Sequence, residues 1–164
     1  MEGTKMDFRL LESGQEAEAS RLVGRVFHRS VAPLFPSEGV EEFLSYATAE
    51  AMAERREQGN LQLAAWAGAK MAAYLEMRAG PHLAMLFIDS PWQRQGVGRR
   101  LLAHALELLR RREPGFSRVT VNSSPNSVEA YRRMGFRASG ESQTKNGISF
   151  VPMYLEIAQS KVHT

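Results

Sequence analysis

The chain has 164 residues, the size of one domain that can bury its own hydrophobic core, and residues 1–164 are expected to form a single domain. Lys and Arg number 21 against 18 Asp and Glu, and a net charge of +3 is too small to indicate a nucleic-acid-binding protein. The absence of cysteine excludes disulfides, thiolate metal sites and cysteine nucleophiles. A charged N-terminus and the lack of any apolar run of about 18 residues predict neither a signal peptide nor a membrane span, so a cytoplasmic location is expected.

The first part of the chain predicts one strand and two helices. Residues 6–11 form the expected strand, and Ser13 with Glu16 matches a capping box that opens a helix. The apolar face of this helix follows helical spacing and consists of Ala19, Leu22, Val23, Val26 and Phe27. Residues 31–36 contain two prolines and predict a loop, after which Ser37 opens a second helix that Gly59 ends.

The middle of the chain predicts strands followed by a crossover. The apolar runs Leu61–Ala67, 71–78 and His82–Ile88 are short and separated by turn residues, which predicts an antiparallel meander. Residues 96–112 have helical apolar spacing, and a strand is expected at residues 118–122. Because a helix connects them, the strands on either side of it are expected to run parallel, with a right-handed connection.

The last part of the chain predicts a short helix and a hairpin. Ser124 and Pro125 form a cap and first-turn pair that opens a helix ending at Met134. Residues 136–143 and 148–157 flank an Asn-Gly pair, which favours a hairpin turn. The fold class is therefore α/β, in the α+β sense, with a mixed, mostly antiparallel sheet of about seven strands and about four helices. Methionines and aromatic residues fall mostly at core periodicities and are interpreted as packing residues.

One glycine-rich segment indicates a ligand. Residues 93–98 read QRQGVG and stand between an expected strand and an expected helix. Glycines remove the obstruction of Cβ, so successive backbone N–H groups can face one anion at the positive end of the helix dipole. The segment predicts a pyrophosphate-binding loop, although a glycine-rich turn without a ligand fits the same letters. Neither GxxxxGK[ST] nor GxGxxG occurs, which disfavours a nucleoside triphosphate or a dinucleotide.

Two motifs together resemble the GNAT superfamily, the Gcn5-related N-acetyltransferases. Gln93, Gly96 and Gly98 match the family's [QR]xxGx[GA] coenzyme A motif, and Tyr131 with Gly135-Phe136 matches its Y-x-x-x-G-F segment. The order of the expected elements agrees with that of the family. The resemblance implies a GNAT fold, in which the fourth and fifth strands are parallel and splay apart, and it implies acetyl-CoA as the acyl donor.

The resemblance also implies which residues bind acetyl-CoA. Phe87 and Ile88 would offer backbone groups to the pantetheine arm, with the Ile88 N–H meeting the acyl carbonyl. The pyrophosphate loop would consist of Gln93, Arg94, Gln95, Gly96, Val97, Gly98 and Arg99. Ser124 stands where many relatives have a cofactor-contacting Asn, so Ser124 and Asn126 are candidates for polar contacts, and a helix cap is the other role open to Ser124.

The catalytic candidates are Tyr131 and Glu76. Tyr131 matches the family tyrosine that protonates the departing thiolate, since a phenol of pKa about 10 can donate to the thiolate of a thiol of pKa about 8.5. A tyrosine that only packs inward is the alternative. Glu76 is at a strand position where relatives sometimes place a catalytic base, but alternation could equally turn it to solvent. Asp89 is a second candidate base, in a turn where a cap also fits. No pair of residues has metal-ligand spacing, so no metal is expected.

The leading interpretation is an acyl-CoA-dependent N-acyltransferase, in which an amine attacks the thioester directly in a ternary complex. A non-catalytic acyl-CoA-binding or sensing domain stays open because no residue is secured as the base, and a basic nucleic-acid module rests on arginines alone. The acceptor, a small-molecule or peptide amine, is expected between the first two helices, especially residues 31–37, and the terminal hairpin. Apolar runs in the last two strands, and the frequency of dimers among similar proteins, predict a homodimer.

Overall fold

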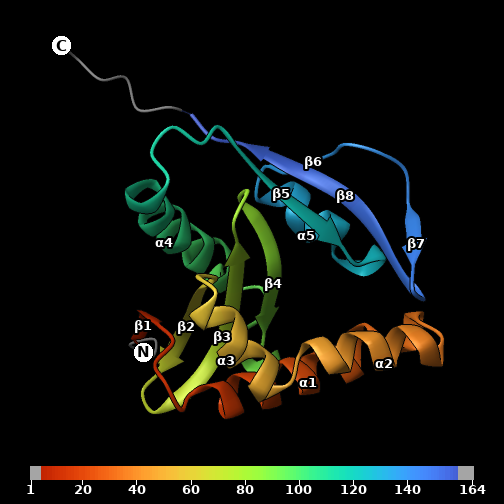
Figure 1. Cartoon of the computed structure of the whole chain (residues 1–164), viewed down its shortest axis with the longest axis horizontal. Coiled ribbons are helices and arrows are strands. Elements are labelled where there is room, and N and C mark those ends of the chain that lie inside the picture. The colour runs from red at the N-terminus through yellow and green to blue at the C-terminus, as the bar shows by residue number, and fades with distance from the viewer. Residues whose placement is uncertain (1–4, 159–164) are drawn as a thin grey trace.

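A mixed β-sheet runs through the molecule and carries helices on both faces (Figure 1). The computed structural model describes residues 5–158. Its eight strands have the order β1-β2-β3-β4-β5-β8-β6, with β7 paired to β8. The strands are β1 (Met6–Leu10), β2 (Leu61–Ala67), β3 (Lys70–Arg78), β4 (His82–Ile88), β5 (Arg118–Ser123), β6 (Arg137–Ala138), β7 (Gln143–Lys145) and β8 (Ile148–Glu156).

Helices fill the connections between the strands. Within residues 5–158, none of them is long and apolar enough to cross a membrane. The mixed α/β architecture expected from the sequence is confirmed, with one strand and one α-helix more than expected. The α-helices are α1 (Glu16–Ser30), α2 (Ser37–Tyr46), α3 (Ala49–Glu57), α4 (Val97–Arg112) and α5 (Val128–Arg133), and the 3-10 turns are η1 (Ala32–Leu34), η2 (Ser90–Trp92) and η3 (Pro125–Ser127).

The single helix expected from Ser37 to Gly59 is in fact two helices. α2 ends at Tyr46, and α3 begins after Thr48, whose side chain caps it by accepting a hydrogen bond from Ala51 N (3.1 Å). A side-chain cap of this kind satisfies an otherwise unpaired N–H of the new helix. The apolar spacing continues across the break, so periodicity alone predicts one helix.

The predicted capping box of Ser13 and Glu16 does not form. α1 begins at Glu16 itself, and its N-cap residue Gln15 makes no side-chain capping bond. The Glu16 carboxylate instead accepts a hydrogen bond from Gly14 N (2.8 Å) and pairs with Arg56 of α3. This acidic side chain therefore joins two helices, and it is not available to Ser13.

The strand expected at residues 136–143 is interrupted. β6 ends at Ala138 and β7 begins at Gln143, although both pair antiparallel with β8. Between them, Ser139 N donates to Pro152 O (2.8 Å). Because Pro152 has no N–H with which to return a bond, the ladder breaks at this point.

The parallel, splayed pair of strands expected from the sequence is confirmed. β4 and β5 pair only near their starts, at His82 with Thr120 and at Leu83 with Val121. Beyond Leu83 the two strands separate, as Figure 1 shows. Residues 84–88 of β4 therefore have a backbone edge that β5 does not cover.

A register shift between β3 and β4 coincides with the start of this separation. Glu76 on β3 lies opposite Met85, whereas the next residue, Met77, lies opposite Leu83. Ala84 is thus one extra residue on β4. A bulge of this kind bends the strand that contains it and increases its twist. β4 consequently turns away from β5 immediately after their last paired residue.

Two hydrophobic clusters lie on the two faces of the sheet, because neighbouring residues of one strand belong to different clusters. Leu63 and Ala65 of β2 pack with α4 and α5, while Ala64 and Trp66 pack with α1 and α3. This alternation is the period-two pattern of a sheet buried on both faces. Each face of β4 therefore meets a different set of helices.

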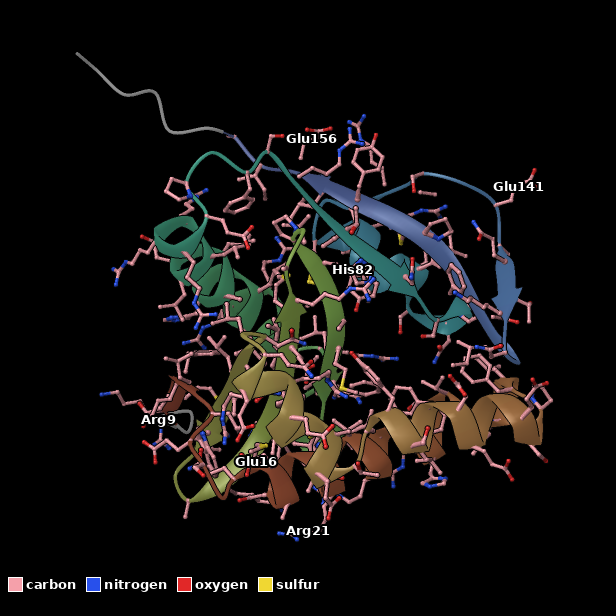
Figure 2. All side chains as sticks on the ribbon, viewed as in Figure 1. Arg9, Glu16, Arg21, His82, Glu141 and Glu156 are labelled. Atoms are coloured by element: carbon pink, nitrogen blue, oxygen red, sulfur yellow. The ribbon has the colours of Figure 1, made fainter. Side chains whose placement is uncertain are left out.

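We predict that His82 makes folding stability sensitive to mild acid. Its Nδ1 lies 2.8 Å from Thr120 Oγ1, where β4 and β5 still pair (Figure 2), and burial together with the charge of Arg78 lowers the pKa of His82 to about 4. In the unfolded chain the His82 imidazole takes up a proton near pH 6.5, whereas in the folded chain it does so only near pH 4. The free energy of unfolding should therefore fall as pH drops from about 6.5 towards 4.

Urea denaturation at several pH values measures this effect. His82→Gln should lose the part of the acid sensitivity that His82 contributes, whereas His104→Gln, at an exposed position on α4, should retain it. Identical pH slopes for the parent and the His82→Gln variant would show that His82 titrates alike in the folded and unfolded chains.

Candidate active site

A cavity of about 670 Å³ opens where β4 and β5 separate. Its walls come from β4, β5, the start of β8, and the segment leading into the first turn of α4. They also include α5, the end of α1 with the loop after it, and α2. Neither Gln95 nor Glu76 contributes to the lining. The predicted site residues that do line it are Phe87, Ile88, Gln93, Arg94, Gly96, Val97, Gly98, Arg99, Ser124, Asn126 and Tyr131.

The open edge of β4 points backbone groups into this cavity. Asp89 N donates to Ala72 O on β3 (2.9 Å). Because N–H directions alternate along a strand, the N–H of Ile88 faces the opposite edge, towards the gap left by β5. The carbonyl of Ile88 accepts a hydrogen bond from Gln93 Nε2 (2.8 Å), which holds the following loop close to the end of β4.

Two glycines, Gly96 and Gly98, stand where the glycine-rich loop enters α4 and packs close to β4. Gly96 is the N-cap of α4 and has φ 78°, a left-handed conformation that favours glycine. A Cβ on Gly98 would lie 3.2 Å from Cδ1 of Ile88, so the first turn of α4 packs directly against β4. The backbone N–H groups of that turn and the helix dipole make this end of the cavity attractive to an anion.

Arginine side chains increase the positive charge at the same end. Arg94, Arg99 and Arg133 all line the cavity. Arg99 donates a hydrogen bond to the backbone carbonyl of Arg133, which joins the start of α4 to the end of α5. Gln95 points away from the cavity lining and donates to Pro91 O (2.8 Å), so it braces the loop instead.

Ser124 and Asn126 organise the turn between β5 and α5. Ser124 is the N-cap residue of η3, with Pro125 in its first turn as predicted, but its hydroxyl makes no capping bond to the backbone. The hydroxyl instead hydrogen-bonds Asn126 Oδ1 (2.8 Å) and Ser127 Oγ (3.0 Å). Asn126 Nδ2 donates to Ser30 O at the end of α1 (2.8 Å). This bond ties two walls of the cavity together across the gap in the sheet.

Tyr131 lies in the wall formed by α5. The residue is only 8% exposed, and its ring meets that of Phe136 edge-on at 5.2 Å. Burial raises the pKa of Tyr131 above that of an ordinary phenol. The hydroxyl is therefore protonated at neutral pH, and it can serve as a proton donor but not as a base.

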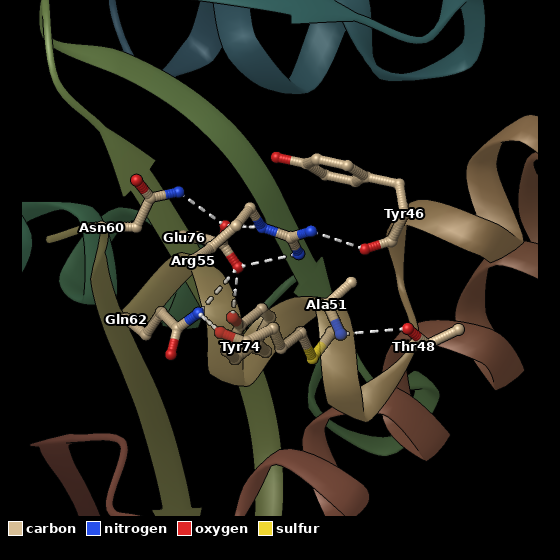
Figure 3. A network of polar contacts seen from close by, with 9 residues as sticks. Tyr46, Thr48, Ala51, Arg55, Asn60, Gln62, Tyr74 and Glu76 are labelled. Carbon is tan, nitrogen blue, oxygen red and sulfur yellow. Dashed lines mark hydrogen bonds and ion pairs between the residues drawn. The ribbon is translucent and has the colours of Figure 1, made fainter. Parts of the chain in front are cut away.

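Glu76 is buried in a network of hydrogen bonds outside the cavity lining (Figure 3). Its Oε1 accepts bonds from Tyr74 Oη (2.6 Å), Gln62 Nε2 (3.1 Å) and Arg55 Nη2 (3.3 Å). Its Oε2 accepts bonds from Asn60 Nδ2 (2.9 Å) and Arg55 Nε. Alternation turns this side chain inward, and the carboxylate is occupied by donors from α3, β2 and β3.

Asp89, the second candidate base, is also occupied. Its side chain accepts a hydrogen bond from Ser90 N (3.0 Å), as a cap of η2, and forms an ion pair with Arg25 of α1 (2.9 Å). Asp89 is absent from the lining of the cavity. Neither acidic residue proposed from the sequence therefore contributes to the cavity lining.

The sequence gives no sign of several residues that line the cavity on its other side. Phe27, Phe43 and Tyr46 belong to this group, together with residues 148–150 of β8. Their helical or alternating spacing predicts core packing only. The loop at residues 31–36 and the terminal hairpin were expected beside the acceptor, and both do supply lining residues.

The chain matches a known protein family and, over part of its length, a curated relative. A family model described as an acetyltransferase (GNAT) domain matches residues 31–157. A curated relative, the peptidyl-lysine N-acetyltransferase YjaB of Salmonella typhimurium, is 36% identical over 64 residues, a match that spans only 39% of this chain and 41% of the relative.

Solved structures share the fold over nearly the whole chain. A GCN5-related N-acetyltransferase from Rhodopseudomonas palustris has a TM-score of 0.77 at 20% identity, covering 96% of this chain and 99% of that one. The PaiA N-acetyltransferase of Thermoplasma acidophilum, solved with coenzyme A, has a TM-score of 0.77 at 16% identity, covering 93% and 99%. The family model covers most of the chain, and the separated strands β4 and β5 and the glycine-rich loop agree with it. The chain belongs to the GNAT acetyltransferase family.

We predict that Glu76→Gln damages the fold and spares the chemistry. The substitution leaves the largely buried guanidinium of Arg55 without its counter-ion, a loss that typically costs about 3 kcal/mol. Denaturant unfolding should register this loss, whereas Glu156→Gln, which disrupts an exposed ion pair with Arg118, should change stability by less than about 1 kcal/mol. Unchanged stability combined with abolished turnover would instead identify Glu76 as the base.

We also predict that Gly98→Glu abolishes tight binding of acetyl-CoA. The new side chain would press on Ile88 and place a negative charge where the loop, the helix dipole and Arg99 favour an anion. Like charges brought together at a binding site cost several kcal/mol, so the dissociation constant should rise by about 100-fold or more. Calorimetry would measure it, with Ala103→Glu on the exposed face of α4 as the control. Equal affinities of the two variants for acetyl-CoA would show that its pyrophosphate does not bind at the glycine-rich loop.

Proposed function

We propose that the protein transfers an acetyl group from acetyl-CoA to a primary amine, by direct attack in a ternary complex. One observation carries the proposal: the uncovered edge of β4, the glycine-rich loop at Gly98 and Tyr131 line one cavity. A thiol carrier with an amide-bearing arm and a pyrophosphate has the chemistry that this edge and this loop can receive.

The residues present fit acetyl-CoA in kind. Residues 84–88 would pair with the amides of the pantetheine arm as an additional strand would. The loop at residues 93–98, with Arg94 and Arg99, would hold the pyrophosphate. Bound in this way, acetyl-CoA supplies an acyl group activated as a thioester.

Two groups of this chain would act on the reacting atoms. The N–H of Ile88, directed to the open edge, would donate to the acyl oxygen as negative charge develops there. The hydroxyl of Tyr131, in the cavity wall, would deliver its proton to the leaving sulfur. The amine would lose its own proton to water. Among the described residues that line the cavity, Glu129 is the acidic one, and it pairs with Arg132 on α5.

A non-catalytic acyl-CoA-binding domain is the second candidate. It is favoured by the positions of Glu76 and Asp89, both of which are engaged outside the cavity lining. Turnover decides between the two, because a sensing domain would bind acetyl-CoA and leave every amine unmodified. Formation of a homodimer and a cytoplasmic location stay predictions from the sequence.

The enzymatic proposal is tested by Tyr131→Phe, which removes the hydroxyl and keeps the ring against Phe136. Loss of a general acid typically slows turnover by about 10²-fold or more, while acetyl-CoA affinity should stay nearly constant. Turnover can be followed by thiol release, and affinity by calorimetry on the same variant. Turnover within about twofold of the parent would make water the proton donor, and a parallel loss of affinity would make Tyr131 a binding residue.

A further inference from the structure

The cavity has an aromatic half on the face of β4 that lies away from the glycine-rich loop. Phe87 projects from β4 towards Phe43 of α2, with ring centroids 5.7 Å apart. Phe43 in turn stacks on Phe27 of α1 at 4.1 Å, with an angle of 20° between the rings. Phe35 and Tyr46 complete this half, and we call these five residues the aromatic compartment.

Alternation along β4 separates this compartment from the charged half. Leu86 and Ile88 point to the face on which the start of α4 packs, because a Cβ on Gly98 would meet both. Phe87, between them, points to the face covered by α1 and α2. An acceptor amine would thus approach an acyl group held beside the N–H of Ile88 from the side of the aromatic compartment.

The aromatic compartment offers no free charge to a substrate. The arginines that line the cavity come from the glycine-rich loop, α4 and α5, and so does Glu129, the acidic lining residue among those described. Beneath the compartment, the guanidinium of Arg55 lies 3.7 Å from the ring centre of Tyr46. Its charge is neutralised by Glu76, and the Tyr46 ring covers it (Figure 3).

This electrostatic environment discriminates among amines. An acceptor with a second ammonium group would lose the hydration of that charge without gaining a carboxylate partner, which is strongly unfavourable. A single amine reaches the thioester uncharged, and an aromatic body attached to it would replace water with ring contacts. Such contacts between aromatic rings are favourable beyond the apolar area that they bury.

The compartment is also bounded at its far end. The turn of the terminal hairpin contains Asn146 and Gly147, both with positive φ, as the sequence predicts for this pair. Gly147 packs backbone against backbone on Gly39 of α2, where an added Cβ would come within 2.1 Å of the Gly147 carbonyl oxygen. Figure 1 shows the tip of this hairpin beside α2. The contact holds the terminal hairpin against α2 next to Phe35.

We propose that the acceptor is a small primary monoamine with an uncharged aromatic ring on a short alkyl chain, an arylalkylamine, bound in the aromatic compartment. This assignment rests on the proposed acetyl transfer. It excludes polyamines and cationic aminosugars as preferred acceptors, because the compartment has no carboxylate for their additional charges. It also disfavours lysine side chains, whose aliphatic stems offer no ring to the aromatic compartment.

A competition among acceptors tests the proposal. With saturating acetyl-CoA, kcat/KM would be measured for 2-phenylethylamine, for 2-cyclohexylethylamine of similar size, for spermidine and for a lysine-containing peptide. We expect 2-phenylethylamine to exceed spermidine and the peptide by about tenfold or more, the scale of discrimination in an apolar pocket, and to exceed the cyclohexyl compound by a smaller factor. Preference for spermidine or the peptide would overturn the acceptor assignment and leave the acetyl-transfer proposal standing.

Two matched substitutions test whether the aromatic compartment causes the preference for 2-phenylethylamine. Phe43→Leu should raise KM for 2-phenylethylamine by about tenfold and leave KM for acetyl-CoA unchanged. Phe116→Leu, the same change outside the cavity lining, should alter neither constant. An unchanged KM for the amine in Phe43→Leu would overturn the proposal.

A binding measurement tests the amine site in the aromatic compartment separately from the acetyl transfer. Calorimetric titration of 2-phenylethylamine into the protein saturated with coenzyme A should give binding that Phe43→Leu weakens. Binding without turnover would support the compartment and refute the acetyl transfer. Turnover of other amines, with no binding of 2-phenylethylamine, would support the acetyl transfer and refute the assignment of the acceptor.

Discussion

The extra residue on β4 at Ala84 is the constraint on which the site depends. It shifts the register against β3 at the point where pairing with β5 ends, so the sheet divides directly after Leu83. Five residues of β4 are left with an uncovered backbone edge, and unsatisfied backbone groups are costly unless water or a ligand pairs with them. The fold thereby keeps a ready binding edge in the middle of the sheet.

The network around Glu76 explains how this division is held in place. Glu76 lies directly opposite Met85, next to the extra residue, and its carboxylate collects donors from α3, β2 and β3. Side chains from three elements must be correctly placed for these bonds to form together, which fixes the register of β3 at the bend. At the closed end of the gap, His82 and Thr120 join β4 to β5. The site is thus framed by buried polar contacts on both sides of the bend.

What could be predicted from the sequence follows from the range of the interactions involved. The segment at residues 93–98 and Tyr131 belong to local motifs, and the structure brings both to one cavity. Ala84 carries no local signal, because a bulge depends on its partner strand. The inward direction of Glu76 depends in the same way on Arg55, a residue in a helix that periodicity merges with α2. Ser13 and Glu16 match a capping box by spacing, but the pairing of Glu16 with Arg56, which is distant in the sequence, overrides it.

The two halves of the cavity also settle where protons can move in the proposed reaction. An ammonium group entering the aromatic compartment would lose its hydration without meeting a carboxylate, so desolvation lowers the pKa of the amine and favours its neutral form. The acceptor therefore sheds one proton to water before it attacks. Attack then places positive charge on nitrogen and negative charge on the acyl oxygen, which the N–H of Ile88 can stabilise. Two proton transfers remain: the nitrogen must release a proton, which water can accept, and the leaving sulfur must gain one, for which Tyr131 lies in the cavity wall as a donor. In the proposed reaction, water would thus take the place of a base from this chain, and Tyr131 would supply the acid.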